Sequence, residues 1–415
     1  MSSNRRPQVS FVLATHNRRA IVVKTLERLA GCGLDRSDYE IIVVDNASDD
    51  GTPEAAASRS DVLIALHRNT GSCAKAYGIE RAAGRYIVFL DDDSYPRPGS
   101  IARMIHRFED DPLLGAAGFA VHLPDGRREG SALPGVFVGC GVGFRSEALK
   151  ATGGLDRSFF MQAEEYDLSF RLVGAGWRVG VFDDLHVDHL KTDCARKSAR
   201  TTYYDIRNNL RIIARYLPSP HCKVYRKDWL QRYGWLAQRD GHTRSFRQGV
   251  RAGRLRGLLE RWAYRKHRHS SSILEHFFRW EYVGRRMADL RASGARRIVL
   301  ADLGKNIYAY YRAARDADIT VSAVGDDRFC GPGRRYRGVP VLSAEDALDL
   351  DPDAVIVSNS SAVHGTDTYN RLLRRVSQPV HHWFAPTDHL PGEEIGSPSS
   401  AHLADDRCVP EAVAL

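Results

Sequence analysis

The 415-residue sequence predicts an α/β protein with two sheets and a helical segment between them. Three observations carry this prediction. Apolar, strand-like runs alternate with helical runs in the N-terminal half and again near the C-terminus. The segment between them has no strand-like runs and is rich in arginine and aromatic residues. The length also exceeds what a single hydrophobic core usually serves.

The N-terminal part contains four expected strands, separated by loops and helical runs. The strands are expected at 9–14, 41–44, 62–66 and 86–90, with helices at 19–30, after Pro53 and near 72–83. This alternation predicts a mostly parallel sheet that helices cover on both faces. Ligands of such sheets collect beyond the carboxyl ends of the strands, and there the sequence places Asp45 and the run Asp91 to Asp93.

The middle of the chain, 200–293, is expected to be helical and strongly basic. Between residues 196 and 297 there are 26 Lys and Arg against 7 Asp and Glu, although the whole chain has a net charge of only +9. Such a surface suits an acceptor, an anionic membrane or a nucleic acid, and the last is disfavoured because no nucleic-acid motif accompanies the charge. A solvated arginine-rich face explains the composition equally well.

The alternation resumes in a second, small Rossmann-like unit. Strands are expected at 297–301, 319–324, 339–342 and 354–357. The spacing from Gly304 to Asp326 resembles a dinucleotide-binding unit, but the other glycines are missing, which favours a structural, oligomerising or acceptor-recognition role. The predicted domains are 1–215, 216–293 and 294–385, followed by a disordered tail at 386–415, and a homo-oligomer is one expectation.

Composition narrows the cellular setting. No apolar run approaches the length that spans a bilayer, and the N-terminus lacks the apolar region of a signal peptide. The seven cysteines are scattered and never spaced Cys-x-x-Cys, which disfavours a disulfide framework or a cysteine-rich zinc module. We expect a cytoplasmic protein, with peripheral binding to the inner face of the membrane as a further possibility.

The acidic run after the fourth strand is a candidate metal site. Three adjacent carboxylates repel one another, and a divalent cation such as Mg²⁺ or Mn²⁺ relieves that repulsion while binding substrate phosphates. Alternation along an extended chain sends Asp91 and Asp93 to the same side. A solvated acidic turn is the plainer interpretation of the same run.

A second carboxylate pair, Glu164 and Glu165, is expected in the first turn of a helix that begins near residue 164. Leu168 and Leu172 form its core face, and Arg171 can pair with Asp167 one turn away. Acidic residues are common at this end of a helix because of its dipole. The functional interpretation is a general base that takes a proton from an acceptor hydroxyl.

Four motifs in sequence order carry a family resemblance. They are the runs Val43 to Thr52, Phe89 to Asp93, Glu164 to Arg171 and Gly174 to Trp177. The pair Phe159-Phe160, shortly before Glu164, adds to the match. Together they resemble the inverting glycosyltransferases of family 2, which have the GT-A fold, and the rhamnosyltransferase-like branch is the most similar. The resemblance covers about residues 7–215.

The resemblance implies a role for each matching position. Glu165 stands at the position of the catalytic base, with Glu164 as the competing candidate. Asp91 and Asp93 correspond to the DxD motif and, with His189, would bind Mn²⁺ or Mg²⁺. The residues implied in binding the nucleotide and its diphosphate are Thr15, Asn17, Arg18, Asp45, Asn46, Asp91 and Asp92.

Two further points qualify these assignments. His186 competes with His189, and the run from His186 through His189 to Asp193 and Cys194 is weakly similar to a zinc site. The segment 69–78 resembles the family's Asn-x-Gly helix start, but it is one residue short and has Tyr77 where the family usually has Asn.

The implied reaction is a single in-line displacement that inverts the anomeric carbon. The donor would be a UDP-, dTDP- or GDP-sugar, and the acceptor a hydroxyl of a glycan, a lipid-linked saccharide or a natural product, with Gly139-Cys140-Gly141 lining the acceptor side. A sugar nucleotidyltransferase is one alternative, but it would need a glycine-rich phosphate loop after the first strand. A degenerate glycan-binding or scaffold protein is the other.

Overall fold

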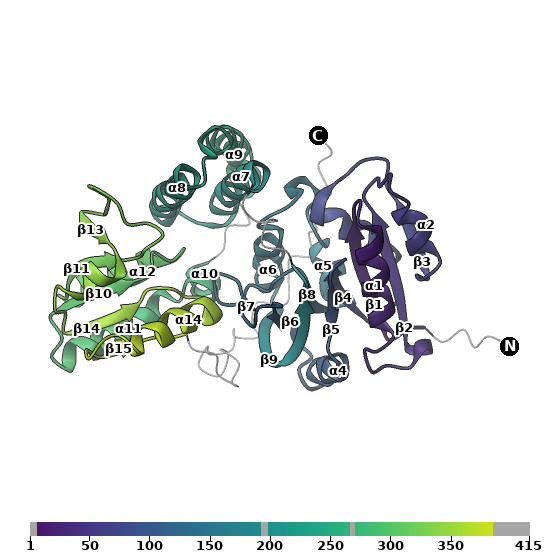
Figure 1. Cartoon of the computed structure of the whole chain (residues 1–415), viewed down its shortest axis with the longest axis horizontal. Helices are drawn as coiled ribbons and strands as arrows, with labels where there is room; N and C mark the ends of the chain where they lie inside the picture. The colour runs from purple at the N-terminus through teal and green to yellow at the C-terminus, as the bar shows by residue number, and fades with distance from the viewer. Residues whose placement is uncertain (1–5, 192–197, 266–269, 385–415) are drawn as a thin grey trace.

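The computed structural model describes residues 6–191, 198–265 and 270–384, which form two sheets joined by a helical layer (Figure 1). The first sheet has the order β3-β2-β1-β4-β8-β6-β9-β5, with β7 paired to β6. Its strands are β1 (Val9–Thr15), β2 (Tyr39–Asp45), β3 (Val62–Ala65), β4 (Tyr86–Asp91), β5 (Ser94–Pro96), β6 (Leu114–His122), β7 (Arg128–Glu129), β8 (Gly141–Arg145) and β9 (Arg178–His189).

The expected strands pair in parallel, and their register collects the predicted polar residues. Thr15 of β1 lies opposite Asp45 of β2, and Ala14 lies opposite Asp91 of β4. The prediction of a mostly parallel sheet was wrong for the other half, because β8 is antiparallel to β4 and β6, and β5 is antiparallel to β9. This mixed sheet is a GT-A-type α/β fold.

Helices cover both faces of the first sheet, as alternation predicted. The buried stripe of α1 runs through Val22, Leu26 and Leu29, whereas Ile21 is 37% exposed. The helices are α1 (Arg19–Leu29), α2 (Thr52–Ala57), α3 (Lys75–Arg81), α4 (Ser100–Asp110), α5 (Ser146–Thr152) and α6 (Glu164–Gly174), with single turns η1 (Arg36–Asp38), η2 (Gly71–Ala74) and η3 (Arg157–Phe159).

The basic middle of the chain is helical, as expected, and its aromatic residues build a core of their own. Tyr225, Trp229, Phe277 and Phe278 are almost completely buried in one cluster with Phe170 of α6. The arginine-rich composition therefore covers an apolar interior. The helices are α7 (Ala199–Tyr216), α8 (His221–Arg239), α9 (Thr243–Ala263), α10 (Ser271–Phe278) and α11 (Trp280–Ala292).

The second sheet has the order β12-β13-β11-β10-β14-β15, and all its pairings are parallel except that of β12. All four strands expected there are present. The predicted tail, 386–415, lies outside the described residues. The elements are β10 (Arg297–Ala301), α12 (Ile307–Asp316), β11 (Thr320–Gly325), β12 (Arg335–Tyr336), β13 (Val339–Leu342), α13 (Ala344–Leu348), β14 (Ala354–Val357), α14 (Ala362–Leu373) and β15 (Val380–His381).

Helix α8 joins the second sheet to the rest of the molecule. The Tyr225 hydroxyl donates to Asn306 Oδ1 at 2.7 Å, and the Trp229 indole donates to the carbonyl of Lys305 at 2.8 Å. Both partners lie in the loop after β10, so this loop is fixed from outside its own sheet. Across the described ranges, no helix has both the length and the apolar character needed to cross a membrane.

Candidate active site

The acidic run leaves β4 and turns at once into the short strand β5. Each of its three carboxylates has a different environment. Asp91 has a side chain that is 40% exposed, whereas Asp92 and Asp93 are only 4% and 5% exposed. Asp91 is therefore the member most open to an incoming ligand.

Asp92 points into the protein. Its carboxylate accepts hydrogen bonds from the Thr15 hydroxyl at 2.8 Å and from Arg18 Nη1 at 2.6 Å. Burial raises the pKa of Asp92, and Arg18 and Thr15 offset this only in part, which leaves it at about 7. Three residues that the sequence assigned to the nucleotide thus contact one another and fix the shape of the acidic loop.

His189 lies against the other two aspartates. Strand β5 pairs with β9 so that Ser94 is opposite His189. The imidazole Nε2 is 3.1 Å from Asp93 Oδ1 and 3.9 Å from Asp91 Oδ2. Burial lowers the pKa of His189, but Cys140 and Asp93 outweigh burial and raise it to about 10, while Asp93 falls to about 2 beside His189 and Arg18. The three predicted metal ligands therefore converge.

The donor set fits a divalent cation. Carboxylate oxygens of Asp91 and Asp93 with one imidazole nitrogen are typical ligands of Mn²⁺, and Mg²⁺ accepts the carboxylates together with substrate phosphates. Cys140 adds a sulfur, because ligand atoms of Asp91, Cys140 and His189 lie within 4.8 Å of one another. His189 must lose its proton to coordinate a metal, so binding would release that proton.

Two buried groups beside this cluster were missed by sequence reasoning. Lys75, at the start of α3, places Nζ 2.6 Å from Asp91 Oδ1 and 2.9 Å from the carbonyl of Gly139. Glu129 of β7 places Oε2 3.1 Å from His189 Nδ1. Lys75 follows the Asn-x-Gly motif and could have been found there, whereas Glu129 carries no sequence signal, because only the pairing of β7 with β6 brings it near.

The predicted nucleotide loop closes on itself through side-chain hydrogen bonds. Asp45 accepts from the backbone N–H of Ser48 at 2.9 Å, and the Ser48 hydroxyl accepts from the backbone N–H of Asn17 at 2.9 Å. Asn46 Oδ1 accepts from the backbone of Thr70 at 2.9 Å. The β1 and β2 loops are thereby tied together at the sheet edge beside the acidic run.

An open groove of about 820 Å³ lies next to this loop, between α1 and α2. Of the predicted site residues, Asn17 and Arg18 line it, whereas the acidic run does not. The groove is therefore a neighbour of the candidate site.

The glutamate pair begins α6, as predicted. The Ser72 hydroxyl donates to Glu164 Oε1, and Oε2 of Glu164 is buried with no hydrogen-bond partner among the described residues. Burial, reinforced by the adjacent Glu164, raises the pKa of Glu165 well above its ordinary value. Because Ser72 contacts Glu164 and Lys75 contacts Asp91, the short segment 72–75 links the glutamates to the acidic run.

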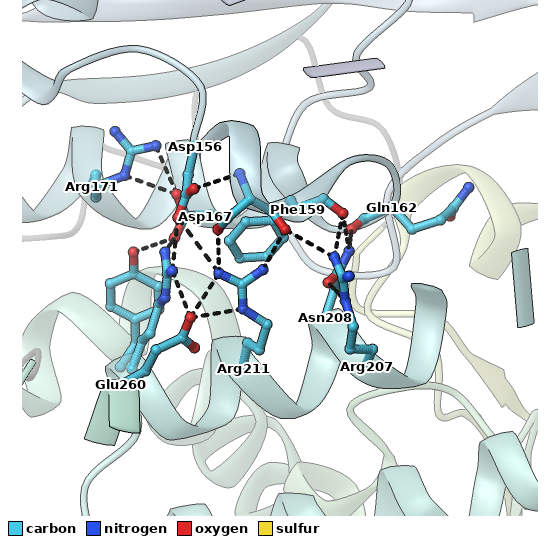
Figure 2. A network of polar contacts seen from close by, with 12 residues as sticks. Asp156, Phe159, Gln162, Asp167, Arg171, Arg207, Asn208, Arg211 and Glu260 are labelled. Carbon is cyan, nitrogen blue, oxygen red and sulfur yellow. Dashed lines mark hydrogen bonds and ion pairs between the residues drawn. The ribbon is translucent and has the colours of Figure 1, made fainter. Parts of the chain in front are cut away.

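The loop that leads into α6 is strained and held from α7 (Figure 2). Phe160, Gln162 and Ala163 have positive φ angles of 69°, 67° and 66°. Asn208 Nδ2 donates to the carbonyls of Phe159, Met161 and Gln162 at 3.0, 2.7 and 2.7 Å. The amide of Asn208 thus fixes the loop that places the glutamates.

Gly71 holds the same loop from the other side. Its φ is +72°, and a Cβ there would lie 2.1 Å from the carbonyl oxygen of Phe160. The backbone of Cys73 donates to that oxygen at 3.3 Å. The glycine of the Asn-x-Gly motif is therefore required by the close approach of two chain segments.

A charge network lies beneath α6 (Figure 2). Asp167 is fully buried and accepts from Arg171 at 2.7 Å and from Arg215 at 2.7 Å. The pairing of Asp167 with Arg171 was predicted. Arg215 also reaches Glu260 at 2.8 Å, and so joins α6, α7 and α9. Sequence reasoning missed Arg215 and Glu260, because their spacing along the chain gives no sign of the contact.

Lys305, from the loop after β10, approaches α6 from the second sheet. Helix α6 is the one that begins with Glu164 and Glu165. The residue is 7% exposed, and its Nζ lies 3.9 Å from the ring centre of Tyr166 and 4.7 Å from that of Trp229. Burial lowers the pKa of Lys305 to about 7, although Asp205 and Glu165 oppose that shift. The side chain of Lys305 therefore packs against Tyr166, the residue after Glu165 in α6.

The zinc alternative is wrong for the histidines. His189 is three positions after His186 on one strand, which sends their side chains to opposite faces. His186 Nδ1 lies 3.0 Å from His122 Nε2, whereas His189 contacts Asp93. Asp193 and Cys194, the other members of that run, lie outside the described residues.

Comparison with known proteins finds a family match for part of the first sheet. Residues 10–150 match the family model described as Glycosyl transferase family 2. The chain is 39% identical over 105 residues to the succinoglycan biosynthesis protein ExoO of Rhizobium meliloti, covering 24% of this chain and 30% of that protein. It is 25% identical over 159 residues to the putative teichuronic acid biosynthesis glycosyltransferase TuaG of Bacillus subtilis, covering 33% and 62%.

A third relative is the undecaprenyl-phosphate 4-deoxy-4-formamido-L-arabinose transferase of Yersinia pestis, 34% identical over 111 residues, with 25% of this chain and 34% of that protein covered. The chain thus spans less than two thirds of each of these relatives.

Among solved structures, the mannosyltransferase PcManGT from Pyrobaculum calidifontis, in complex with GDP-Man and Mn2+, overlaps with a TM-score of 0.45 at 18% identity, covering 61% of this chain and 88% of that chain. S. aureus TarS 1-349 in complex with UDP-GlcNAc overlaps with a TM-score of 0.44 at 15% identity, covering 63% and 93%. Residues 10–150, which carry β1 to β8 and the acidic run, are thus similar to glycosyltransferases of family 2.

Proposed function

We propose that the chain is a metal-dependent inverting glycosyltransferase that moves a sugar from a nucleoside diphosphate sugar to an acceptor hydroxyl. One observation carries the proposal. Asp91, Asp93 and His189 converge beyond β4, and the segment 72–75 connects them to the glutamate pair of α6. A site for the leaving diphosphate and a site for a base would therefore adjoin.

The residues divide the chemistry as follows. Asp91, Asp93 and His189 would hold the cation, which when bound supplies positive charge for the departing diphosphate. Glu165 takes the proton of the acceptor hydroxyl as that oxygen attacks the anomeric carbon. The new bond joins the acceptor oxygen to this carbon, and the bond to the diphosphate oxygen breaks on the opposite face. The anomeric configuration is therefore inverted.

The electrostatics support Glu165 as the base. A carboxylate accepts a proton better when its pKa is raised, and both burial and Glu164 raise that of Glu165. Glu164 is tied to the Ser72 hydroxyl, which keeps that oxygen from the acceptor. Glu164 then acts as the neighbour that raises the basicity of Glu165.

The donor and acceptor are proposed at the level of class. A UDP-, dTDP- or GDP-sugar is the donor class. Two relatives are named for succinoglycan and teichuronic acid biosynthesis, and a third for undecaprenyl phosphate. These names support a growing polysaccharide or a lipid-linked saccharide as the acceptor of this chain.

Donor binding tests the metal half of the proposal. We expect one class among UDP-, dTDP- and GDP-sugars to raise the melting temperature with Mn²⁺ or Mg²⁺ and not with EDTA. Asp93→Ala should abolish the shift, whereas Asp125→Ala, at an exposed pair with Arg127, should retain it. A shift that survives in EDTA would contradict the metal role. Pyrophosphate release from a nucleoside triphosphate and a sugar phosphate would instead identify a nucleotidyltransferase.

Transfer tests the base. We expect Glu165→Gln to lower kcat by about 10²- to 10⁴-fold, the usual contribution of general base catalysis, with donor binding unchanged. Glu164→Gln should have the smaller effect, because it only alters the pKa of its neighbour. The two variants differ by one position in the same turn, so each controls for the other. Equal transfer by Glu165→Gln and the wild type would overturn the assignment.

A further inference from the structure

The outer face of α9 carries an exposed apolar patch. Four side chains at helical spacing, each with about two thirds of its area exposed, face outward in the C-terminal half of this helix. They are Leu255, Leu258, Leu259 and Trp262, with exposures of 65%, 70%, 64% and 71%. No other large apolar side chain of the described residues reaches 60% exposure. A contiguous patch of this kind marks an interaction surface.

The patch cannot turn inward, because the opposite face of α9 is fixed. Gly249, Gly253 and Gly257 lie against α7, where a Cβ would come within 2.5 Å of the Tyr203 carbonyl oxygen, 2.8 Å of the Arg207 carbonyl oxygen and 3.3 Å of Ala214 Cβ, respectively. The two helices therefore pack backbone to backbone. Figure 1 shows α9 at the periphery, with α7 between it and α6.

Arginines surround the patch. Arg251, Arg254 and Arg256 are exposed and have no ion-pair partner among the described residues. The guanidinium of Arg265 lies 4.5 Å from the ring centre of Trp262. The helix contains one acidic residue, Glu260, which is buried and paired with Arg211 and Arg215. The surface that faces solvent is thus apolar in the middle and cationic at its border.

We propose that this face of α9 docks on an anionic phospholipid bilayer. Leucine and tryptophan on one helix face insert at the boundary of headgroups and acyl chains, and arginines beside them reach the lipid phosphates while their stems stay apolar. A second copy of the chain is the poorer partner, because a twofold interface would bring the same arginines against one another. An anionic bilayer offers an apolar boundary to the leucines and tryptophan and phosphates to the arginines around them.

Docking would also orient the candidate site. Helix α7 packs against α9 and holds the loop before Glu164 through Asn208. The acceptor side would therefore keep a fixed position relative to the lipid surface. This inference does not depend on the proposed sugar transfer, since lipid binding is measured without a donor.

Vesicle sedimentation of the full chain tests the proposal. We expect binding to vesicles of phosphatidylglycerol and phosphatidylcholine in equal parts, weaker binding to pure phosphatidylcholine, and release by high salt. The triple variant Leu255→Ser, Leu258→Ser, Trp262→Ser should bind about tenfold more weakly or worse. The double variant Leu113→Ser, Leu373→Ser removes apolar side chains that are 58% and 51% exposed elsewhere, and it should bind like the wild type.

The result that overturns the proposal is equally concrete. Wild-type protein that does not sediment with anionic vesicles, or a triple variant that sediments as well as the wild type, excludes membrane docking by this face. A dimer in light scattering that the triple variant converts to a monomer, without vesicle binding, would assign the patch to self-association instead. Donor binding by all variants would show that the protein is folded and would keep this outcome separate from failure of the proposed enzyme activity.

Discussion

At the scale of single residues, the charges beyond β4 neutralise one another before any ligand is present. Arg18 pairs with Asp92 and Asp93, Lys75 with Asp91, and His189 with Asp93. Burial of a carboxylate without such a partner would be costly. The acidic run therefore keeps a fixed shape, and a metal would replace the proton of His189 as the partner of the aspartates.

Lys305 gives a prediction at this scale. Its positive charge lowers the pKa of Glu165, so Lys305→Met should raise that pKa further and protonate the base at higher pH. We expect the acid limb of kcat/KM against pH to move upward by about one unit. Lys305→Arg, which keeps the charge, should leave the limb near its wild-type position. The same acid limb in Lys305→Met and the wild type would exclude an electrostatic role for the lysine.

At the scale of elements, α7 contacts two different segments from two of its sides. One side holds the 158–163 loop through Arg207 and Asn208, and another accepts the glycines of α9. The loop it holds contains three positive φ angles outside glycine, each of which costs about 1–3 kcal/mol. Because the loop does not adopt this shape unaided, the helix that clamps it also fixes the start of α6, where Glu164 and Glu165 lie.

Asn208→Ala tests this clamp. The change removes hydrogen bonds to three carbonyls, and we expect the free energy of unfolding to fall by about 1–3 kcal/mol in a urea titration. kcat should fall by more than tenfold, while the donor dissociation constant stays within about twofold, because only the base is displaced. Thr202→Ala, at a half-buried position of α7 whose hydroxyl bonds the Ser198 carbonyl, is the control. A loss of stability with normal kcat would reduce Asn208 to a purely structural residue.

At the scale of the whole molecule, the second sheet is attached through buried polar contacts to α8. Asp228 is 6% exposed and binds both the Tyr336 hydroxyl at 2.8 Å and Arg337 Nη2 at 2.7 Å. Burial raises the pKa of Asp228, and Arg337 opposes this. The attachment brings Lys305 to Tyr166 of α6. The C-terminal unit therefore contacts the candidate site as well as α8.

Asp228→Ala tests the attachment. Removing the carboxylate leaves Arg337, whose side chain is 20% exposed, without its partner, and we expect the protein to lose about 2–4 kcal/mol of stability. Calorimetry should then show the second sheet unfolding at a lower temperature than the first. Asp316→Ala, at a surface pair with Arg312, should change stability by less than about 1 kcal/mol. One unshifted transition in Asp228→Ala would contradict the coupling.

The parts of the site that lie near strand ends could be predicted, and the parts that depend on distant pairing could not. Asp91, Asp93 and Glu165 could be named as candidates because strand exits and helix starts are local patterns. The sequence did not indicate their linkage through Ser72 and Lys75, the carboxylate of Glu129 beside His189, or the approach of Lys305. Each of these residues reaches the site from a segment whose position depends on the whole fold.

The sequence by itself determined the order of elements, the family resemblance and the carboxylates available for metal and base, because these follow from local periodicity and from motif spacing. Tertiary structure alone decided that the sheet is mixed, that Asp92 turns inward to Thr15 and Arg18, and that α7 holds the loop before Glu164. It also decided which face of α9 meets solvent. The physical reason is that burial, pairing of charges and close packing are relations between segments far apart in the chain, and such relations leave no period or spacing in the sequence.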